Sequence, residues 1–291
     1  MQPRTAALDA MLRRDFPFLK DVVARTAAES GAAWADEMER TLRMFDDAEL
    51  ATAGHGYARF VVDLVRRQRA FERDGAYPRK SYSEAAAEVY HDDAYMTGQY
   101  LPGLLIAHLL WPHHRRHAEF FDAAFADVMA TAGARAFAEV GVGTGFYSRR
   151  LLERLPEVRG AGYDVSAAAL AFARRHLDAL GVADRYETRL GEPSIDPVEW
   201  LVCIEVLEHL EDPVAFLRDL RAALVPGGTA FVTAALNAAH VDHIFLYESP
   251  DAVAAHLAEA GFAVQRDFVG AAHPPARPDQ PVPAVAAFVV T

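Results

Sequence analysis

Three glycines at alternating positions mark the segment best suited to hold a ligand, Glu139-Val140-Gly141-Val142-Gly143-Thr144-Gly145. A short apolar run precedes this segment and an amphipathic pattern follows it, which predicts a strand, a tight turn and a helix. Such a turn presents backbone N–H groups and the N-terminus of a helix to a bound group. Glycine suits the turn because it leaves the backbone open to close approach. We therefore predict a cofactor site at this turn.

The spacing of the glycines distinguishes between cofactors. Dinucleotide-binding loops follow the pattern G-x-G-x-x-G, whereas these glycines fall at positions 141, 143 and 145. Asp164 ends the next apolar run, 21 residues beyond Gly143, where a carboxylate can accept hydrogen bonds from a ribose diol. Glu139 places an acid beside the loop, which suits a cofactor with an ammonium and a sulfonium group. The alternative is a tight turn without a ligand, and the register of strand, helix and Asp164 argues against it.

Candidate proton-transfer residues follow two later apolar runs. His209 comes shortly after the run 200–204, and a second set follows the run 229–233: Asn237, His240, Asp242 and His243. The carboxyl ends of parallel strands share one edge of a sheet, so we expect these side chains near the cofactor. Histidine is well suited to act as a general base at neutral pH. We predict catalytic roles for the histidines and Asp242 and an acceptor contact for Asn237. The alternatives are bonds to loop backbone or positions on the surface.

Three tyrosines lie in the segment 90–100, just before an apolar stretch: Tyr90, Tyr95 and Tyr100. An aromatic face attracts a sulfonium group, and a phenol hydroxyl can anchor a carboxylate or another polar group. We predict that Tyr95 contacts the cofactor and that Tyr90 and Tyr100 contact the acceptor. The alternative is that these tyrosines pack a seam between two parts of the chain.

Two pairs of histidines have spacings that could serve a metal ion. His240 and His243 form one pair, and His113 and His117, four residues apart, form the other. Neither pair has a third ligand at a diagnostic spacing. We therefore predict no metal site, and we expect His113 and His117 to belong to the start of an amphipathic helix beside Trp111.

The elements that must position these residues change character near residue 130. The earlier part of the chain has helical periodicity, and the run 101–110 is apolar on all sides, which predicts a buried helix. After residue 134, short apolar runs alternate with amphipathic helices, which is typical of a parallel α/β sheet. The predicted strands are 135–140, 158–163, 185–190, 200–204, 229–233, 262–268 and 284–290. We predict a helical region, 1–130, and a cofactor-binding domain, 131–291.

Composition excludes several classes of protein. The chain has 291 residues, 52% hydrophobic and 24% charged, which is typical of a globular protein. A net charge of −12 disfavours nucleic acid and anionic membranes as partners. The single cysteine, Cys203, excludes an internal disulfide. We find no signal peptide, and no apolar stretch is long enough to span a bilayer. We expect a soluble, cytoplasmic protein.

From about Ala134 to its C-terminus the sequence resembles the class I S-adenosylmethionine (SAM)-dependent methyltransferases. The matching elements are Glu139–Gly145, Asp164, Gly191-Glu192, Glu205-Val206-Leu207-Glu208-His209-Leu210 and Pro226-Gly227-Gly228. The resemblance implies a Rossmann-like, seven-stranded, mostly parallel sheet with its last strand antiparallel, and a helical N-terminal lid. It also implies contacts to SAM from the following residues: Tyr95, Glu139, Gly141, Gly143, Thr144, Gly145, Asp164, Val165, Glu192 and Glu205. In this scheme Gly141–Gly145 hold the methionine part, Asp164 the ribose and Glu192 the adenine edge.

The segment that begins at Glu205 also indicates the kind of acceptor. Amino-group methyltransferases of the family place an Asn/Asp/Ser-Pro-Pro-aromatic tetrad here, and this chain has Glu205-Val206-Leu207-Glu208 instead. The segment resembles the branch that methylates small molecules, on oxygen, nitrogen or an acidic carbon. An enzyme that moves or cyclises the aminocarboxypropyl arm of SAM and releases methylthioadenosine remains an alternative, as does a non-catalytic SAM-binding protein. The N-terminal helices are a candidate surface for pairing two copies.

Overall fold

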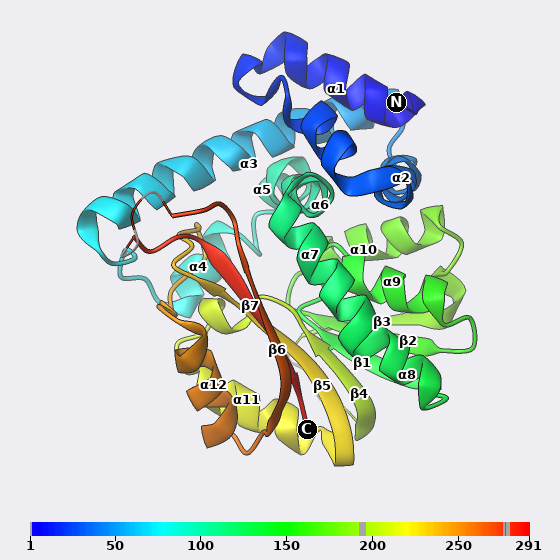
Figure 1. The fold of residues 1–291 in the computed structure, drawn as a ribbon, viewed down its shortest axis with the longest axis vertical. Coiled ribbons are helices and arrows are strands. Elements are labelled where there is room, and N and C mark those ends of the chain that lie inside the picture. Colours follow the sequence, from blue (N-terminus) through cyan, green and yellow to red (C-terminus); the bar gives the residue numbers. More distant parts are fainter. Residues whose placement is uncertain (1, 192–195, 276, 278–279) are drawn as a thin grey trace.

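The computed structural model describes residues 2–191, 196–275, 277 and 280–291. A helical region precedes one sheet (Figure 1). Its helices are α1 (Pro3–Asp15), η1 (Pro17–Leu19), α2 (Val22–Leu42), α3 (Asp47–Asp74), α4 (Tyr82–Glu88), α5 (Asp93–Tyr95), η2 (Met96–Tyr100), α6 (Leu101–Leu110), α7 (Pro112–Phe121), η3 (Asp122–Ala126) and α8 (Asp127–Thr131). The segments η2 and η3 are single π-helical turns.

The sheet has seven strands in the order β3-β2-β1-β4-β5-β7-β6. The strands are β1 (Ala136–Val140), β2 (Arg159–Asp164), β3 (Tyr186–Leu190), β4 (Val198–Cys203), β5 (Leu224–Leu236), β6 (Val264–Ala271) and β7 (Ala284–Val290). The strand β7 pairs antiparallel with β5 and β6, and the other pairs are parallel. The predicted Rossmann-like, mostly parallel α/β sheet behind a helical region is thereby confirmed.

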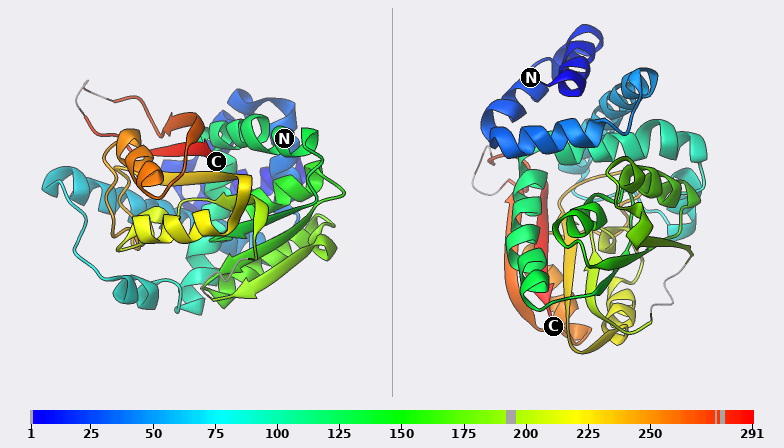
Figure 2. Two further views of the ribbon diagram at one scale, coloured as in Figure 1. Left: turned by 90° about the horizontal axis from the view of Figure 1, so that it is seen from below. Right: turned by 90° about the vertical axis from the view of Figure 1, so that its right-hand side faces the viewer.

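Helices cover both faces of the sheet (Figure 2). The helices that follow β1 along the chain are α9 (Phe146–Arg154), α10 (Ala167–Ala179), η4 (Ala183–Arg185), η5 (Leu207–His209), α11 (Pro213–Ala222) and α12 (Pro250–Glu259). The helices α9 and α10 contact β2, α11 contacts β5, and α7 contacts β6 and β7. Each of α10, α11 and α12 begins at a side chain that accepts a backbone N–H: Ser166, Asp212 and Ser249.

The fifth strand is longer than its apolar run predicts. It pairs with β4 at Leu224, loses register, and pairs again at Thr229, so Pro226-Gly227-Gly228 lies inside the strand. Gly227 takes a positive φ of 81° there, which lets the chain bulge before pairing resumes. The strand then continues to Leu236 because β7 pairs with it along this whole length.

The helical region and the sheet share one hydrophobic core. A single cluster of buried side chains includes Leu12 of α1, Tyr57 of α3, Leu105 of α6 and Phe231 of β5. Because apolar burial is the main favourable contribution to folding, this shared cluster holds the two regions together. The predicted boundary at residue 130 falls in α8, where the helical region ends.

Buried ion pairs add a polar link between the same two regions. Arg149 of α9 is 2% exposed and pairs with Glu37 of α2 and with Glu153. Arg150 pairs with Glu37 and Asp122. Burial alone would raise the pKa of Glu37, but the two guanidinium groups lower it below its ordinary value. Breaking a buried pair typically costs about 3–5 kcal/mol, so these contacts fix α2 against α9.

Among the described residues, no helix combines the length and apolar character that a membrane span requires.

Candidate active site

The glycine loop joins β1 to α9 as the sequence predicts. Gly141, Gly143 and Gly145 have positive φ values of 74°, 51° and 70°. A Cβ on Gly141 would lie 2.4 Å from Cγ2 of Val206, and one on Gly145 would lie 3.0 Å from Ala173. A Cβ on Gly143 would project into open space, where its nearest neighbour is Leu104 at 3.9 Å. The loop is therefore a cradle that a side chain at position 143 would begin to fill.

Asp164 ends β2 and holds the loop in place. One carboxylate oxygen accepts a hydrogen bond from the Gly143 N–H at 3.0 Å, and the other accepts from the Ser166 N–H at 2.9 Å. Burial raises the pKa of Asp164, and the bonds from these backbone N–H groups oppose that rise. Val165 follows on the rim of the cavity and is 38% exposed. Asp164 thus ties the loop to the strand end where a ribose is expected.

Two further predicted residues of the loop, Glu139 and Thr144, accept hydrogen bonds from residues outside it. Glu139 is buried and accepts a hydrogen bond from the Ser148 hydroxyl, and burial raises its pKa to about 8. The Thr144 carbonyl oxygen accepts from Nδ1 of His176 at 2.9 Å. No sequence pattern indicated the role of His176, because it lies within an otherwise ordinary amphipathic helix, α10. Glu192, the predicted adenine contact, lies outside the described residues.

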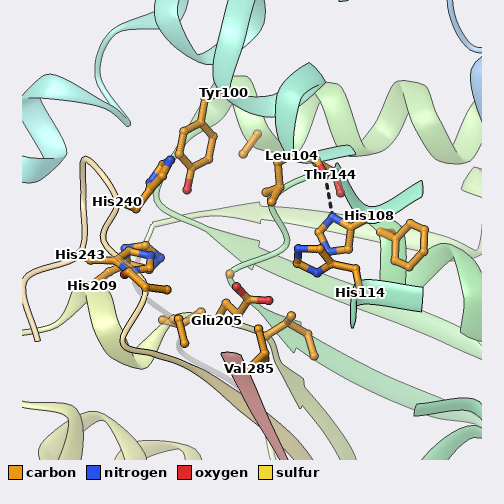
Figure 3. A pocket seen from close by; sticks show the side chains of 18 of the residues that line it. Tyr100, Leu104, His108, His114, Thr144, Glu205, His209, His240, His243 and Val285 are labelled. Carbon is orange, nitrogen blue, oxygen red and sulfur yellow. Dashed lines mark hydrogen bonds between the residues drawn. The ribbon is translucent and has the colours of Figure 1, made fainter. Parts of the chain in front are cut away.

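Glu205 lies in the middle of the candidate site (Figure 3). Its backbone takes a positive φ of 49°, which is uncommon for a residue with a side chain. The Glu205 N–H donates to Oγ1 of Thr233 at 2.9 Å, which holds this conformation. Burial and the neighbouring Glu208 raise the pKa of Glu205 to about 8. Strained backbone of this kind is often found at functional sites.

A cavity of about 1440 Å³ opens from the glycine loop toward the helical region. Its walls include Phe60 of α3, Tyr100 of η2, Leu104 and His108 of α6, and Val285 of β7. The two regions of the chain therefore enclose one space, in which the cofactor loop and a chamber for a second molecule are continuous.

Asp242 accepts hydrogen bonds from side chains of the helical region and of the sheet domain. It is fully buried and accepts from the Tyr90 hydroxyl at 3.0 Å, from the Tyr100 hydroxyl at 2.9 Å and from Nδ1 of His240 at 2.5 Å. Nδ1 of His209 lies 3.6 Å from the same carboxylate. We call these five residues the Asp242 cluster. Burial would raise the pKa of Asp242, but His209 and His240 hold it well below its ordinary value.

The histidines of this region differ in their protonation. Nδ1 of His209 bonds to the carbonyl oxygen of Asp242 at 3.1 Å, so Nδ1 carries a proton. Burial lowers the pKa of His209, but Asp242 and Glu208 outweigh it and raise the pKa above its ordinary value. Nδ1 of His243 donates to the Ala238 carbonyl at 2.6 Å, and burial with nearby His209 lowers its pKa well below the ordinary value. Asp242 therefore stabilises the protonated form of His209.

Two predicted ligand contacts lie away from the cavity wall. Tyr95 packs against Tyr100, with 6.1 Å between ring centroids, and does not line the cavity. Asn237 turns the chain after β5 with a positive φ of 49°, and its side chain donates to the Glu248 carbonyl at 2.9 Å. The contacts predicted for Tyr95 and Asn237 remain predictions. The bond from the Asn237 amide to Glu248 closes the loop that carries His240 and His243.

Potential metal ligands also gather here. Glu208, His209 and His243 form one set and His240, Asp242 and His243 form another, each with ligand atoms within 4.8 Å of one another. The Nδ1 atoms of all three histidines already take part in hydrogen bonds. That the site works without a metal remains a prediction.

Comparison with known proteins decides the family. A family described as methyltransferase domain matches residues 138–230, which include the glycine loop, Asp164 and His209. This part of the chain is a class I SAM-dependent methyltransferase domain. The chain is 32% identical over 99 residues to the ubiquinone biosynthesis O-methyltransferase of Pseudomonas paraeruginosa, covering 33% of this chain and 42% of that protein. It is 34% identical over 111 residues to the protein of the same name from Marinobacter nauticus, covering 36% and 45%.

Solved structures share the fold of this methyltransferase over a longer stretch. The mitomycin 7-O-methyltransferase MmcR superposes with a TM-score of 0.55 at 17% identity, covering 98% of this chain and 94% of MmcR. The O-methyltransferase NcsB1 from neocarzinostatin biosynthesis gives 0.53 at 20% identity, covering 82% and 70%. The curated sequence relatives match over less than half of their own length. These structural likenesses show the fold alone.

The residues present fit SAM, the cofactor of this family. The glycine loop leaves room at Gly143, backbone N–H groups and α9 begin there, and Asp164 and Glu139 supply acids on either side. A glycine-lined cradle beside the Asp164 carboxylate suits a ligand with a ribose diol and cationic groups better than a pyrophosphate. Gly141–Gly145 would hold the methionine part and Asp164 the ribose.

Proposed function

We propose that this protein transfers the methyl group of SAM to an oxygen atom of a small acceptor that binds between the glycine loop and the Asp242 cluster. One observation carries the proposal: His209, supported by Asp242, lines the same cavity as the cofactor loop. The curated relatives from Pseudomonas paraeruginosa and Marinobacter nauticus are named O-methyltransferases, which favours oxygen over nitrogen or carbon.

SAM, when bound, supplies an electrophilic methyl group. The protein's own work is to orient the acceptor for in-line displacement and to exclude water. Nε2 of neutral His209 can accept the proton of an acceptor hydroxyl as its oxygen takes the methyl group. The Asp242 carboxylate then stabilises the imidazolium that results, since Nδ1 of His209 lies 3.6 Å away. Tyr90 and Tyr100, which bond to Asp242, form the adjoining wall.

The sulfur by-product of SAM tests the proposal against its main alternative. We expect incubation with SAM and a panel of phenols and hydroxylated acids to release S-adenosylhomocysteine together with an O-methylated product. Methylthioadenosine as the by-product would instead show transfer or cyclisation of the aminocarboxypropyl arm. Mass spectrometry of both nucleosides distinguishes the two reactions, and binding of SAM without either product would indicate a non-catalytic protein. Pairing of two copies through the N-terminal helices remains a separate prediction.

Replacement of His209 by glutamine is expected to lower kcat by about 10²–10⁴ with little change in the Kd for SAM, because the change removes a base and not a cofactor contact. The pKa of His209 is raised above its ordinary value, so its neutral form, and with it kcat, should increase as pH rises through that pKa. The pH profile of kcat should lose this limb in His209→Gln. The exposed His55 of α3 supplies a matched control, His55→Gln. An unchanged pH profile in His209→Gln would assign the proton transfer to another group.

A close contact between α3 and η2 positions Tyr100. A Cβ on Gly56 of α3 would lie 2.6 Å from the Gly98 carbonyl oxygen, which is backbone and cannot rotate away. We expect Gly56→Ala to displace the π-helical turn and reduce kcat roughly tenfold. Gly98→Ala is the control, because nothing lies within 4 Å of its added Cβ. Equal kcat values for the two variants would show that the position of Tyr100 is unimportant.

A further inference from the structure

One wall of the cavity consists of histidines that the proposed reaction does not use. His108 lies in α6, and His113 and His114 lie in the first turn of α7. All three line the cavity, and their exposed fractions are only 5%, 7% and 4%. In Figure 3, His108 and His114 lie side by side, across the pocket from His209, His240 and His243, with Glu205 between the two groups. We call His108, His113 and His114 the histidine wall.

Ring contacts make this wall rigid. The ring of Trp111 stacks on those of His113 and His114, with centroids 5.6 and 5.4 Å away. The ring of His114 lies 4.6 Å from that of His108, which in turn lies 4.8 Å from Phe146. Phe146 is the first residue of α9, directly after the glycine loop. The column of rings therefore runs from the junction of α6 and α7 to the edge of the cofactor cradle.

The three imidazoles are uncharged at neutral pH. Burial lowers the pKa of His108 to about 4 and, together with the charge of neighbouring His117, that of His113 to about 3. Burial and His113 hold the pKa of His114 well below its ordinary value. A neutral imidazole offers one N–H donor and one nitrogen acceptor. The wall can therefore exchange hydrogen bonds with a ligand but carries no charge to attract one.

Hydrogen-bonding capacity in this wall is left unused within the described part of the chain. Nδ1 of His108 bonds to the Leu104 carbonyl at 2.8 Å, so its Nε2 is an acceptor, and that atom has no partner there. Nδ1 of His113 is also without one. The side chain of His114 lines the cavity beside them. Buried polar atoms are nearly always bonded. Two such nitrogens on one face of a cavity therefore indicate that a ligand completes them.

We propose that the histidine wall is a second polar subsite, which binds an uncharged hydroxyl or carbonyl group of the acceptor on the side away from His209. This inference rests on the proposed function, because its ligand is the methyl acceptor. A hydroxyl can donate to a free ring nitrogen, and a carbonyl can accept from a ring N–H. A carboxylate would find no compensating charge among three neutral rings, so the subsite disfavours it.

Binding of matched naphthalene derivatives tests this subsite without turnover. The protein is saturated with S-adenosylhomocysteine and titrated calorimetrically with 2,7-dihydroxynaphthalene, 2-naphthol and 7-hydroxy-2-naphthoate. We expect the diol to bind about tenfold more tightly than 2-naphthol, since it adds one hydrogen bond. The naphthoate should bind no more tightly than 2-naphthol. The variant His114→Phe, which keeps a ring in the stack, should abolish the advantage of the diol, and His108→Phe provides a second variant.

His117→Phe is the matched control. His117 belongs to the same helix and is 1% exposed, but it does not line the cavity. This variant should keep the tenfold difference. The proposal is overturned by equal affinities of the diol and 2-naphthol for the parent protein, by persistence of the difference in both wall variants, by preference for the naphthoate, or by no binding of any probe. Because the sulfur by-product is measured separately, failure here leaves the proposed methyl transfer intact.

Discussion

Replacement of Asp242 by asparagine is expected to reduce kcat by about 10³ while the Kd for SAM changes less than threefold. Removing the carboxylate behind a catalytic histidine can cost up to about 10⁴ in rate, because the imidazolium loses its stabilising charge. Asp242 also accepts hydrogen bonds from Tyr90, Tyr100 and His240. An amide offers one acceptor oxygen in place of two, and its NH₂ group would face one of these partners.

The pH dependence separates this effect from a general loss of structure. Asp242 raises the pKa of His209, so Asp242→Asn should lower that pKa and move the rising limb of kcat to lower pH. Tyr90→Phe is the matched control, because it removes one hydrogen bond and leaves the negative charge. It should reduce kcat only about tenfold and leave the limb in place. Unchanged kcat in Asp242→Asn, with a folded protein, would remove Asp242 and His209 from the proposed mechanism.

The second large effect concerns binding of the cofactor. We expect Asp164→Ala to raise the Kd for SAM at least 100-fold. A hydrogen bond to a charged group contributes about 1.5–3 kcal/mol, and each 1.4 kcal/mol is tenfold in affinity. The substitution removes the predicted ribose contact and also releases the N–H groups of Gly143 and Ser166, which the carboxylate holds at 3.0 and 2.9 Å. The loop would then have to be ordered when SAM binds.

A double comparison distinguishes the ribose contact from the support of the loop. S-adenosylhomocysteine and its 2′-deoxy analogue are titrated against the parent protein and Asp164→Ala. If Asp164 binds the ribose, the analogue should bind the parent more weakly, and the variant should no longer distinguish the two ligands. If Asp164 only supports the loop, both proteins will discriminate equally. An unchanged Kd for S-adenosylhomocysteine in Asp164→Ala would exclude both roles.

Local patterns in the sequence predicted the parts of this structure that depend on neighbours along the chain. The apolar runs located all seven strands, and the spacing of Gly141, Gly143 and Gly145 located the cofactor loop, because a strand, a turn and a helix are determined by consecutive residues. The bulge at Gly227 was not predicted, since its cause is pairing with β4 and β7.

Contacts between distant residues were predicted only in part. Tyr90 and Tyr100 were expected near the acceptor, but their hydrogen bonds to Asp242 span 152 and 142 residues and depend on where the segment after α4 and the turn η2 lie relative to the sheet. Tyr95 ends α5, and the π-helical turn that begins at Met96 presents Tyr100 to the cavity, so the cofactor contact of Tyr95 stays a prediction. His108 and His114 were interpreted as helix residues. Four histidines within 108–117, beside a run that is apolar on all sides, were the available signal.

The core that joins Leu12 and Tyr57 to Phe231 has a practical consequence for finding the acceptor. Regions that share one core unfold together, so the protein should show a single melting transition. A ligand present at 100 times its Kd adds about 2.7 kcal/mol to the stability of the folded state. For a chain of this size that corresponds to a rise in Tm of roughly 4 °C. Acceptors can therefore be sought by thermal shift, with S-adenosylhomocysteine already bound and no assay for the product.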